Sequence, residues 1–164
     1  MPTPPAIRVQ PVTPALRPQV LRLQVRPDQQ RFVSPPALTL ADAEQCPGST
    51  PMAILRGSTV VGYYRIESSA RAMTGRDDDT DAPGLRSFQI DAAWQGRGIG
   101  HRALAALLDD LAVRHADARR LVLAVDAGNA AALALYRRHG FAEERAMYHD
   151  GRPGPQRVLW RSLP

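Results

Sequence analysis

Alternating and continuous runs of apolar residues predict strands in the first half of the chain. Positions from Ile7 to Gln10 alternate between apolar and polar side chains, as in a half-buried strand. Two apolar runs, Pro51 to Leu55 and Thr59 to Ile66, flank Arg56-Gly57-Ser58, and a short glycine-containing loop between such runs is typical of a hairpin. We therefore expect this half to be partly antiparallel.

Two short helices are expected beside these strands. Thr13-Pro14 offers an N-cap with proline at the first helical position, and the segment would run to about Leu23 unless Pro18 shortens it. The spacing of Thr39-Leu40-Ala41-Asp42 resembles a capping box, and Cys46-Pro47-Gly48 would end the helix that follows. Both helices would be small.

The stretch from Ser68 to Pro83 is polar and rich in aspartate. Asp77, Asp78, Asp79 and Asp81 make it too charged to pack in a core, so we expect a mobile, solvated loop. Alternatively, these carboxylates attract a cationic substrate.

The second half changes to a strand-helix-strand-helix pattern. Its apolar spacing predicts a strand over 85–91, a helix over 98–115, a strand over 121–125 and a helix over 129–139. The runs Phe141 to Tyr148 and Arg157 to Leu163 flank a turn-rich segment, which predicts a final antiparallel pair. A mixed sheet with helices around it follows, as one domain over residues 1–164, with residues 1–5 disordered.

Composition limits the classes of function. The net charge is +5, and all 21 basic residues are arginine, which excludes Schiff-base chemistry on lysine and the phosphate-loop lysine of nucleotide hydrolases. The arginines are scattered, so an anionic cofactor is a better explanation of the charge than nucleic acid. No membrane span or secretory signal is recognisable, and we expect a cytoplasmic protein.

The strongest local signal is the turn Gln95-Gly96-Arg97-Gly98-Ile99-Gly100, which lies between a strand and a helix. Unpaired amides and the helix dipole bind anions there, glycine allows a diphosphate to approach the backbone, and Arg97 can add a charged contact. A dinucleotide-binding domain uses the same physics, but its fingerprint requires a glycine where His101 stands. A diphosphate-bearing cofactor is therefore expected.

Asn129 and Tyr136 are separated by seven residues and so lie on nearly the same face of the predicted helix, about 10 Å apart along its axis. Together they could contact an extended ligand. Asn129 could instead only cap the helix, and Tyr136 could be an ordinary packing residue.

These motifs resemble the GNAT superfamily of acetyl-coenzyme A dependent N-acetyltransferases. The resemblance is carried by Phe88-Gln89-Ile90-Asp91, the Gln95–Gly100 turn, Asn129, Ala132, Leu135-Tyr136 and Gly140-Phe141, in the family's order. Weaker similarity, over Gln30 to Val33 and Leu38 to Ala43, is to the diamine and spermidine acetyltransferase branch.

The resemblance implies an α/β (α+β) fold with a mixed, centrally splayed sheet of about six to seven strands flanked by helices. It also implies a binding mode for acetyl-coenzyme A. Phe88, Gln89 and Ile90 would pair with the pantetheine arm, the amides of Gly96 to His101 would hold the pyrophosphate, and Asn129 would contact the arm. Tyr136 would protonate the leaving thiolate, and the Ile90 backbone amide would stabilise the tetrahedral intermediate.

The general base is not identifiable from the sequence. Glu67 and Asp91 end strands and are candidates, although either can be a structural carboxylate. His139 ends a helix, where a cation would favour the dipole, and no residues have convincing metal-ligand spacing, so no metal is expected. A base or a water chain would deprotonate the amine.

Three functions remain open. The first is acetylation of a small-molecule amine, in particular a polyamine, and the second is acetylation of a protein N-terminus or lysine. The third is a non-catalytic acyl-coenzyme A binding module that regulates a partner. An edge strand in the mixed sheet also makes a homodimer plausible.

Overall fold

The computed structural model describes residues 5–147 and 155–163, and in these ranges seven strands form one sheet. The strand order is β1-β2-β3-β4-β5-β7-β6. Neighbouring strands are antiparallel except for β4 and β5, which are parallel. The mixed α/β sheet agrees with the sequence expectation, whereas the prediction for residues 1–4 and the turn at 149–154 lie outside the described residues. The strands are β1 Ile7–Pro11, β2 Ser49–Arg56, β3 Thr59–Glu67, β4 Gly84–Ile90, β5 Arg120–Asp126, β6 Ala142–Met147 and β7 Gln156–Ser162.

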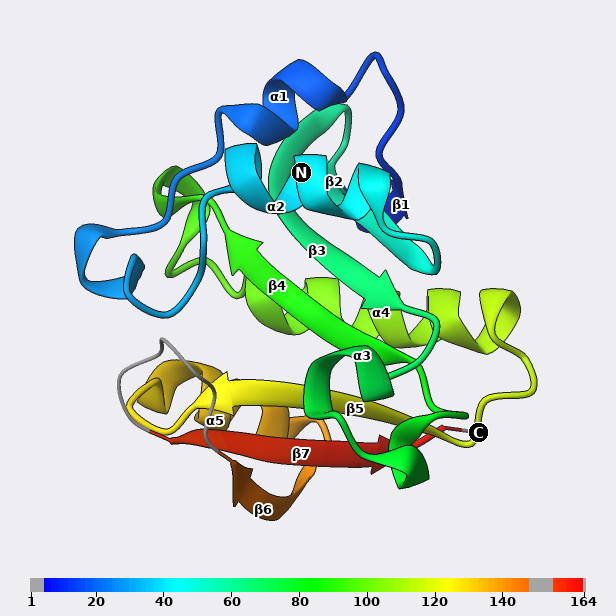
Figure 1. Ribbon diagram of the computed structural model, residues 1–164. Coiled ribbons are helices and arrows are strands. Elements are labelled where there is room, and N and C mark those ends of the chain that lie inside the picture. Colours follow the sequence, from blue (N-terminus) through cyan, green and yellow to red (C-terminus); the bar gives the residue numbers. More distant parts are fainter. Residues whose placement is uncertain (1–4, 148–154, 164) are drawn as a thin grey trace.

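Helices cover both faces of the sheet (Figure 1). The long helix α4 (Ile99–Arg114) and α5 (Ala130–Arg138) lie on one face, where Leu104, Leu107 and Leu111 are buried against the strands. On the other face, α1 (Arg17–Leu21) and α2 (Pro36–Gln45) cover β2 and β3, with Val20 and Leu40 buried between them. The single turn α3 (Arg71–Thr74) packs beside β5 on that same face.

Two predicted helix starts were wrong. α1 begins at Arg17, and Pro18 lies in its first turn, while Thr13 lies in the turn before the helix, where its hydroxyl oxygen accepts from the Leu16 amide and its carbonyl from the Arg17 amide. α2 begins at Pro36, where the preset φ of proline suits a first helical turn, so Thr39 is inside the helix and its hydroxyl donates back to the Pro35 carbonyl. The capping-box interpretation fails because the N-cap is Pro35 rather than Thr39, so the helix begins four residues earlier.

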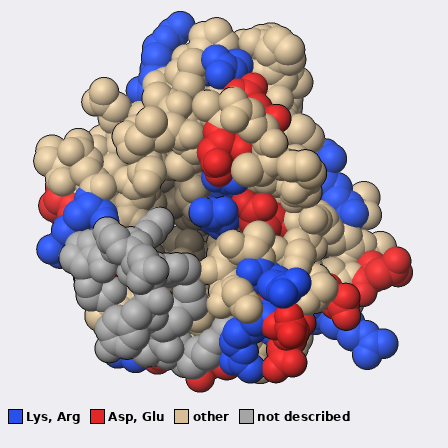
Figure 2. All heavy atoms as spheres, in the orientation of Figure 1, with Lys and Arg blue, Asp and Glu red and all other residues tan. Residues whose placement is uncertain are grey.

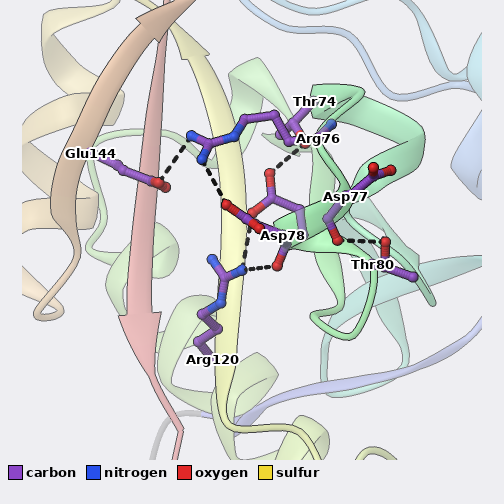
Figure 3. Close-up of polar contacts among 8 residues, drawn as sticks. Thr74, Arg76, Asp77, Asp78, Thr80, Arg120 and Glu144 are labelled. Atoms are coloured by element: carbon purple, nitrogen blue, oxygen red, sulfur yellow. Dashed lines mark hydrogen bonds and ion pairs between the residues drawn. The ribbon is translucent and has the colours of Figure 1, made fainter.

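The aspartate-rich stretch is folded rather than a mobile loop. It contains α3 and the 3-10 turn η2 (Asp77–Asp79), and Asp79 is 1% exposed. Asp79 pairs with Arg120 Nη2 of β5 at 3.0 Å and accepts a hydrogen bond from the Thr74 hydroxyl, and Figure 3 shows the side chains around this network. Arg76 forms ion pairs with the exposed Asp78 and with Glu144 of β6. The charges were expected to prevent packing, but Arg120 of β5 pairs with Asp79, and two arginines of the stretch itself, Arg71 and Arg76, pair with Asp77 and Asp78.

The sheet opens between its two parallel strands. β4 and β5 pair only at Gly84 with Val122 and at Leu85 with Leu123, and beyond these residues they diverge towards their carboxyl ends (Figure 1). A bulge in the β3–β4 pairing accompanies the divergence, with Ser87 at φ 60°, a left-handed conformation that is rare for serine. The expected central splay of the sheet is therefore present.

Candidate active site

Two cavities meet at the opening between β4 and β5. The first has a volume of about 490 Å³ and is enclosed by α2, α3, β3 and the diverging strands. The second, of about 400 Å³, lies beside the Gln95–Gly100 turn. Figure 2 shows a hollow at the centre of the face on which α2 and α3 lie. Five residues line both cavities: Phe32, Val33, Phe88, Asn129 and Ala132.

The glycine turn has the backbone geometry that an anion site needs. Gly96 and Gly98 have φ of 77° and 74°, in the left-handed region, and Gly98 is the N-cap of α4. Gly100 is different, because its φ is not positive and an added methyl group would meet only the Leu135 side chain, at 3.6 Å. Two of the three glycines are thus required by backbone conformation.

Gln95 fixes this turn to the end of β4. Its side-chain Nε2 donates to the Ile90 carbonyl at 2.8 Å and to Gln29 Oε1 at 2.7 Å. Ile90 lies opposite Gly62 of β3, while the next amide, that of Asp91, donates to Val61. In an antiparallel ladder this alternation directs the amide and carbonyl of Ile90 away from β3, towards the opening. The Gln95 side chain therefore holds the glycine turn against the end of β4.

The predicted cofactor residues gather around the second cavity. It is lined by Phe88, Gln89, Ile90, Gln95, Gly96, Gly98, Ile99, Gly100, His101 and Asn129. Arg97 does not line it, and its guanidinium lies 5.0 Å above the ring of Trp94. Gln89 is buried, and its side chain donates to the Ser87 carbonyl within the bulge.

Asn129 both caps α5 and lines the two cavities, so the two interpretations of this residue are compatible. Its Oδ1 accepts a hydrogen bond from the Ala132 amide at 3.2 Å. Tyr136 lies further along the same helix. It lines the first cavity, and its ring packs edge-on against Phe88 and Phe141. Burial raises the pKa of the Tyr136 phenol well above its ordinary value. The phenol is therefore protonated at neutral pH and can donate a proton.

The two carboxylates predicted as bases are held in structural interactions. Asp91 accepts hydrogen bonds from the amides of Gln24 and Ala93, at 2.9 and 3.2 Å, and caps the turn η3 (Ala92–Trp94). Glu67 is 5% exposed and pairs with two arginines of the sheet. Neither residue is among those that line the two cavities. This geometry gives no support to either as a base.

Two carboxylates that the sequence did not single out as site residues line the first cavity. Asp126 ends β5, and its Oδ1 accepts a hydrogen bond from the Gly128 amide at 2.7 Å. Asp42 of α2 pairs with Arg65, and this hydrogen bond holds the pKa of the Asp42 carboxyl below its ordinary value. Asp126 could have been suspected, because it ends a strand beside the predicted opening of the sheet.

The two histidines near the turn form a pair. His101 Nδ1 and His139 Nε2 are 3.2 Å apart and the rings stack, while burial, His101 and Arg161 lower the pKa of His139. This environment favours the neutral ring and gives no support to the suggestion that His139 serves its helix as a cation. In the described ranges, no three His, Cys, Asp or Glu residues are grouped as metal ligands would be.

Comparison with known proteins gives the family. Residues 18–141 match the model of the acetyltransferase (GNAT) family. The chain belongs to this family. The GNAT chain is also similar to the spermine/spermidine N(1)-acetyltransferase of Bacillus subtilis, with 29% identity over 142 residues that cover 83% of this chain and 88% of the relative.

Other similarities are more limited. The N-alpha-acetyltransferase RimI of Mycobacterium tuberculosis is 39% identical over 85 residues, which cover 52% of this chain and 47% of that protein. The spermidine N-acetyltransferase from Vibrio cholerae, solved in complex with CoA and spermine, shares the fold with a TM-score of 0.71 at 12% identity, over 96% of this chain and 95% of that one. No helix in the described ranges is both long and apolar enough to cross a membrane. The homodimer and the cytoplasmic location stay predictions.

Proposed function

We propose that this GNAT protein transfers the acetyl group of acetyl-coenzyme A to a primary amine of a small molecule by direct attack in a ternary complex. The observation that supports this most is the meeting of two cavities at the opening between β4 and β5. The glycine turn lines the second cavity, and Tyr136 lines the first. In this proposal the thioester would lie beside Phe88 and Asn129, because these two residues line both cavities.

The residues of the second cavity fit the cofactor. Amides at Gly96 to His101 would bind the pyrophosphate, and Phe88 to Ile90 would pair with the pantetheine arm along the free side of β4, with Asn129 contacting the arm. Gln95 would hold the turn against the strand. Arg97 would add a charged contact from the rim.

In the reaction, the neutral amine forms a C–N bond with the thioester carbonyl, and the C–S bond then breaks. The Ile90 amide would donate a hydrogen bond to the carbonyl oxygen as negative charge develops on it. Tyr136 would give its proton to the departing thiolate, and the proton lost by the amine would leave through water towards Asp126, the cavity carboxylate without an arginine partner in the described residues. No protein nucleophile is needed.

Release of free coenzyme A thiol tests this function. Purified protein with acetyl-coenzyme A and a panel of primary amines, including spermidine, should release thiol faster than hydrolysis alone, with acetylated amine formed in equal amount. Release at the hydrolysis rate with every amine would refute the proposal. If the protein bound acetyl-coenzyme A tightly in calorimetry but never turned over, a non-catalytic binding module would be the better explanation.

The names of the relatives suggest two kinds of acceptor. Similarity to a spermine/spermidine acetyltransferase extends along most of both chains and favours a polyamine or diamine. Similarity to an N-alpha-acetyltransferase covers about half of each chain and keeps a protein N-terminus as the alternative. Peptides with free N-termini belong in the same panel, because turnover of a peptide alone would favour the second kind.

A further inference from the structure

The charges that line the first cavity restrict the acceptor further. In the described ranges, four charged residues line it, Asp42, Arg65, Arg86 and Asp126, two of each sign. Figure 2 shows blue and red atoms side by side at the edge of the hollow. A cavity selective for a molecule with several positive charges is expected to be mainly acidic. The first cavity instead carries equal numbers of acidic and basic side chains.

Most of this charge is already neutralised within the protein. The Arg65 side chain is 2% exposed and pairs with Asp42 Oδ2 at 2.9 Å and Glu67 Oε1 at 3.2 Å, and it also donates to the Ser49 hydroxyl. Because every direction of this guanidinium is occupied, Arg65 is a fixed part of the wall. Asp42 is paired with Arg65 through Oδ2, so the buried guanidinium offsets its negative charge.

Arg86 is different. Only its Nη1 has a partner in the described part of the chain, Glu67 Oε1 at 3.2 Å, and that oxygen is shared with Arg65. The Arg86 side chain is 35% exposed and lines the cavity, so Nε and Nη2 are left to bind a ligand. A guanidinium with adjacent free donors suits a carboxylate or another oxyanion.

The opposite wall carries the complementary charge. Asp126 lines the same cavity from β5, and no cation in the described ranges pairs with it. Leu85 and Leu123 are the last paired residues of β4 and β5. Arg86 lies one residue beyond this pair on β4, and Asp126 lies three residues beyond it on β5. At about 3.3 Å per residue, the two positions are offset by roughly 7 Å along the strands. The cation site therefore lies further into the opening than the anion site.

We propose that the acceptor is an amine that also carries an acidic group, such as an amino acid, with the acid bound by Arg86 and the amine placed between Asp126 and Tyr136. This inference rests on the proposed acetyltransferase function and names its substrate class. It differs from the polyamine suggested by the relatives, because a polyamine would bring additional ammonium groups next to the positive Arg86, where the charges of Asp42 and Glu67 are already offset by arginines.

Matched amines test the proposal. Ornithine and putrescine differ by one carboxylate, and so do lysine and cadaverine. With thiol release as the assay, kcat/KM should be at least tenfold higher for the amino acid of each pair. In Arg86→Gln the preference should fall towards unity, mainly through a higher KM for the amino acid, while Arg86→Lys should retain part of it.

Controls separate binding from folding. Arg8→Gln changes an exposed arginine of β1 that donates a hydrogen bond to Gln10, and it should leave the preference unchanged. An unchanged KM for acetyl-coenzyme A would show that Arg86→Gln is folded, and if that variant does not fold, the ratio in the unaltered protein decides alone. A preference for the diamines, or a preference that survives in Arg86→Gln, would overturn the acidic acceptor but not the acetyltransferase. If no amine of the panel gave thiol release above hydrolysis, the proposed function itself would be refuted.

Discussion

Arg65 and Arg86 lie directly opposite each other on β3 and β4, and both guanidinium groups contact the same oxygen, Glu67 Oε1, at 3.2 Å. Like charges opposite each other on neighbouring strands repel. The buried Glu67 carboxylate therefore joins two positive charges at the point where the sheet begins to open. A structural function of this kind accounts for its burial better than a catalytic one.

Replacing Glu67 by glutamine should destabilise the protein strongly. The substitution keeps the shape but removes one of the two carboxylate charges that compensate the 2% exposed Arg65 side chain, and loss of one member of a buried ion pair typically costs about 3–5 kcal/mol. Urea unfolding would measure the free energy. Glu44→Gln, which removes the partner of Arg17 from a surface pair, is the matched control and should change stability little. Equal effects in the two variants would contradict the role assigned to Glu67.

Tyr136→Phe should reduce kcat about a hundredfold or more while leaving the KM for acetyl-coenzyme A within a few-fold, because loss of a general acid typically has this effect. The ring contacts with Phe88 and Phe141 would be kept, so the melting temperature should be little changed. Since the pKa of Tyr136 is raised, the phenol stays protonated at pH 10. A kcat that fell with an apparent pKa near 10 in the unaltered protein, but not in the variant, would contradict this.

The stability of the protein should decrease as the pH rises above about 10, and Tyr64 should contribute. Burial raises the pKa of Tyr64 far above its ordinary value, whereas the unfolded side chain ionises near pH 10. The unfolded state therefore loses a proton that the folded state keeps, and stability present below pH 10 is lost above it. Denaturant unfolding at pH 7 and at pH 11 should show a smaller loss for Tyr64→Phe.

At pH 7, Tyr64→Phe should be as stable as the unaltered protein or more stable, by up to about 1 kcal/mol. The Tyr64 hydroxyl is buried and has no hydrogen-bond partner in the described residues, so its removal abolishes a desolvation penalty without breaking a bond. A clear loss of stability at neutral pH would show that the hydroxyl does have a partner.

Asp79→Asn should weaken the wall of the first cavity. α3 contributes Ala72 and Met73 to this wall, and the buried Asp79 ties the segment to Arg120 of β5 (Figure 3). We expect a several-fold higher KM for the acceptor with an unchanged KM for acetyl-coenzyme A. Asp78→Asn, which changes the neighbouring exposed carboxylate, should have little effect on either constant. An equal rise in both KM values for Asp79→Asn would contradict a local role.

Local patterns predicted the parts of the fold that depend on local physics. The hairpin around Gly57 and the helix after the glycine turn follow from apolar periodicity, and the left-handed φ of Gly96 and Gly98 is what a glycine-rich turn leads one to expect. The start of α2 was missed because two adjacent prolines were not recognised as a helix start.

The parts of the site that were missed depend on residues distant in sequence. Asp79 looks solvated until Arg120, 41 residues later, is placed beside it. Glu67 looks like a free strand-end carboxylate until β4 brings Arg86 next to it. Polar residues are assigned correctly only when their partners are known, and pairing across strands determines those partners.

Under the proposed binding mode, the divergence of β4 and β5 would also couple the folding equilibrium to the supply of cofactor. A ligand that binds between two strands of the folded sheet has no comparable site on the unfolded chain, so by mass action a concentration one hundred times its Kd adds about 2.7 kcal/mol to the unfolding free energy. The lifetime of this protein in the cell would then follow the concentration of acetyl-coenzyme A.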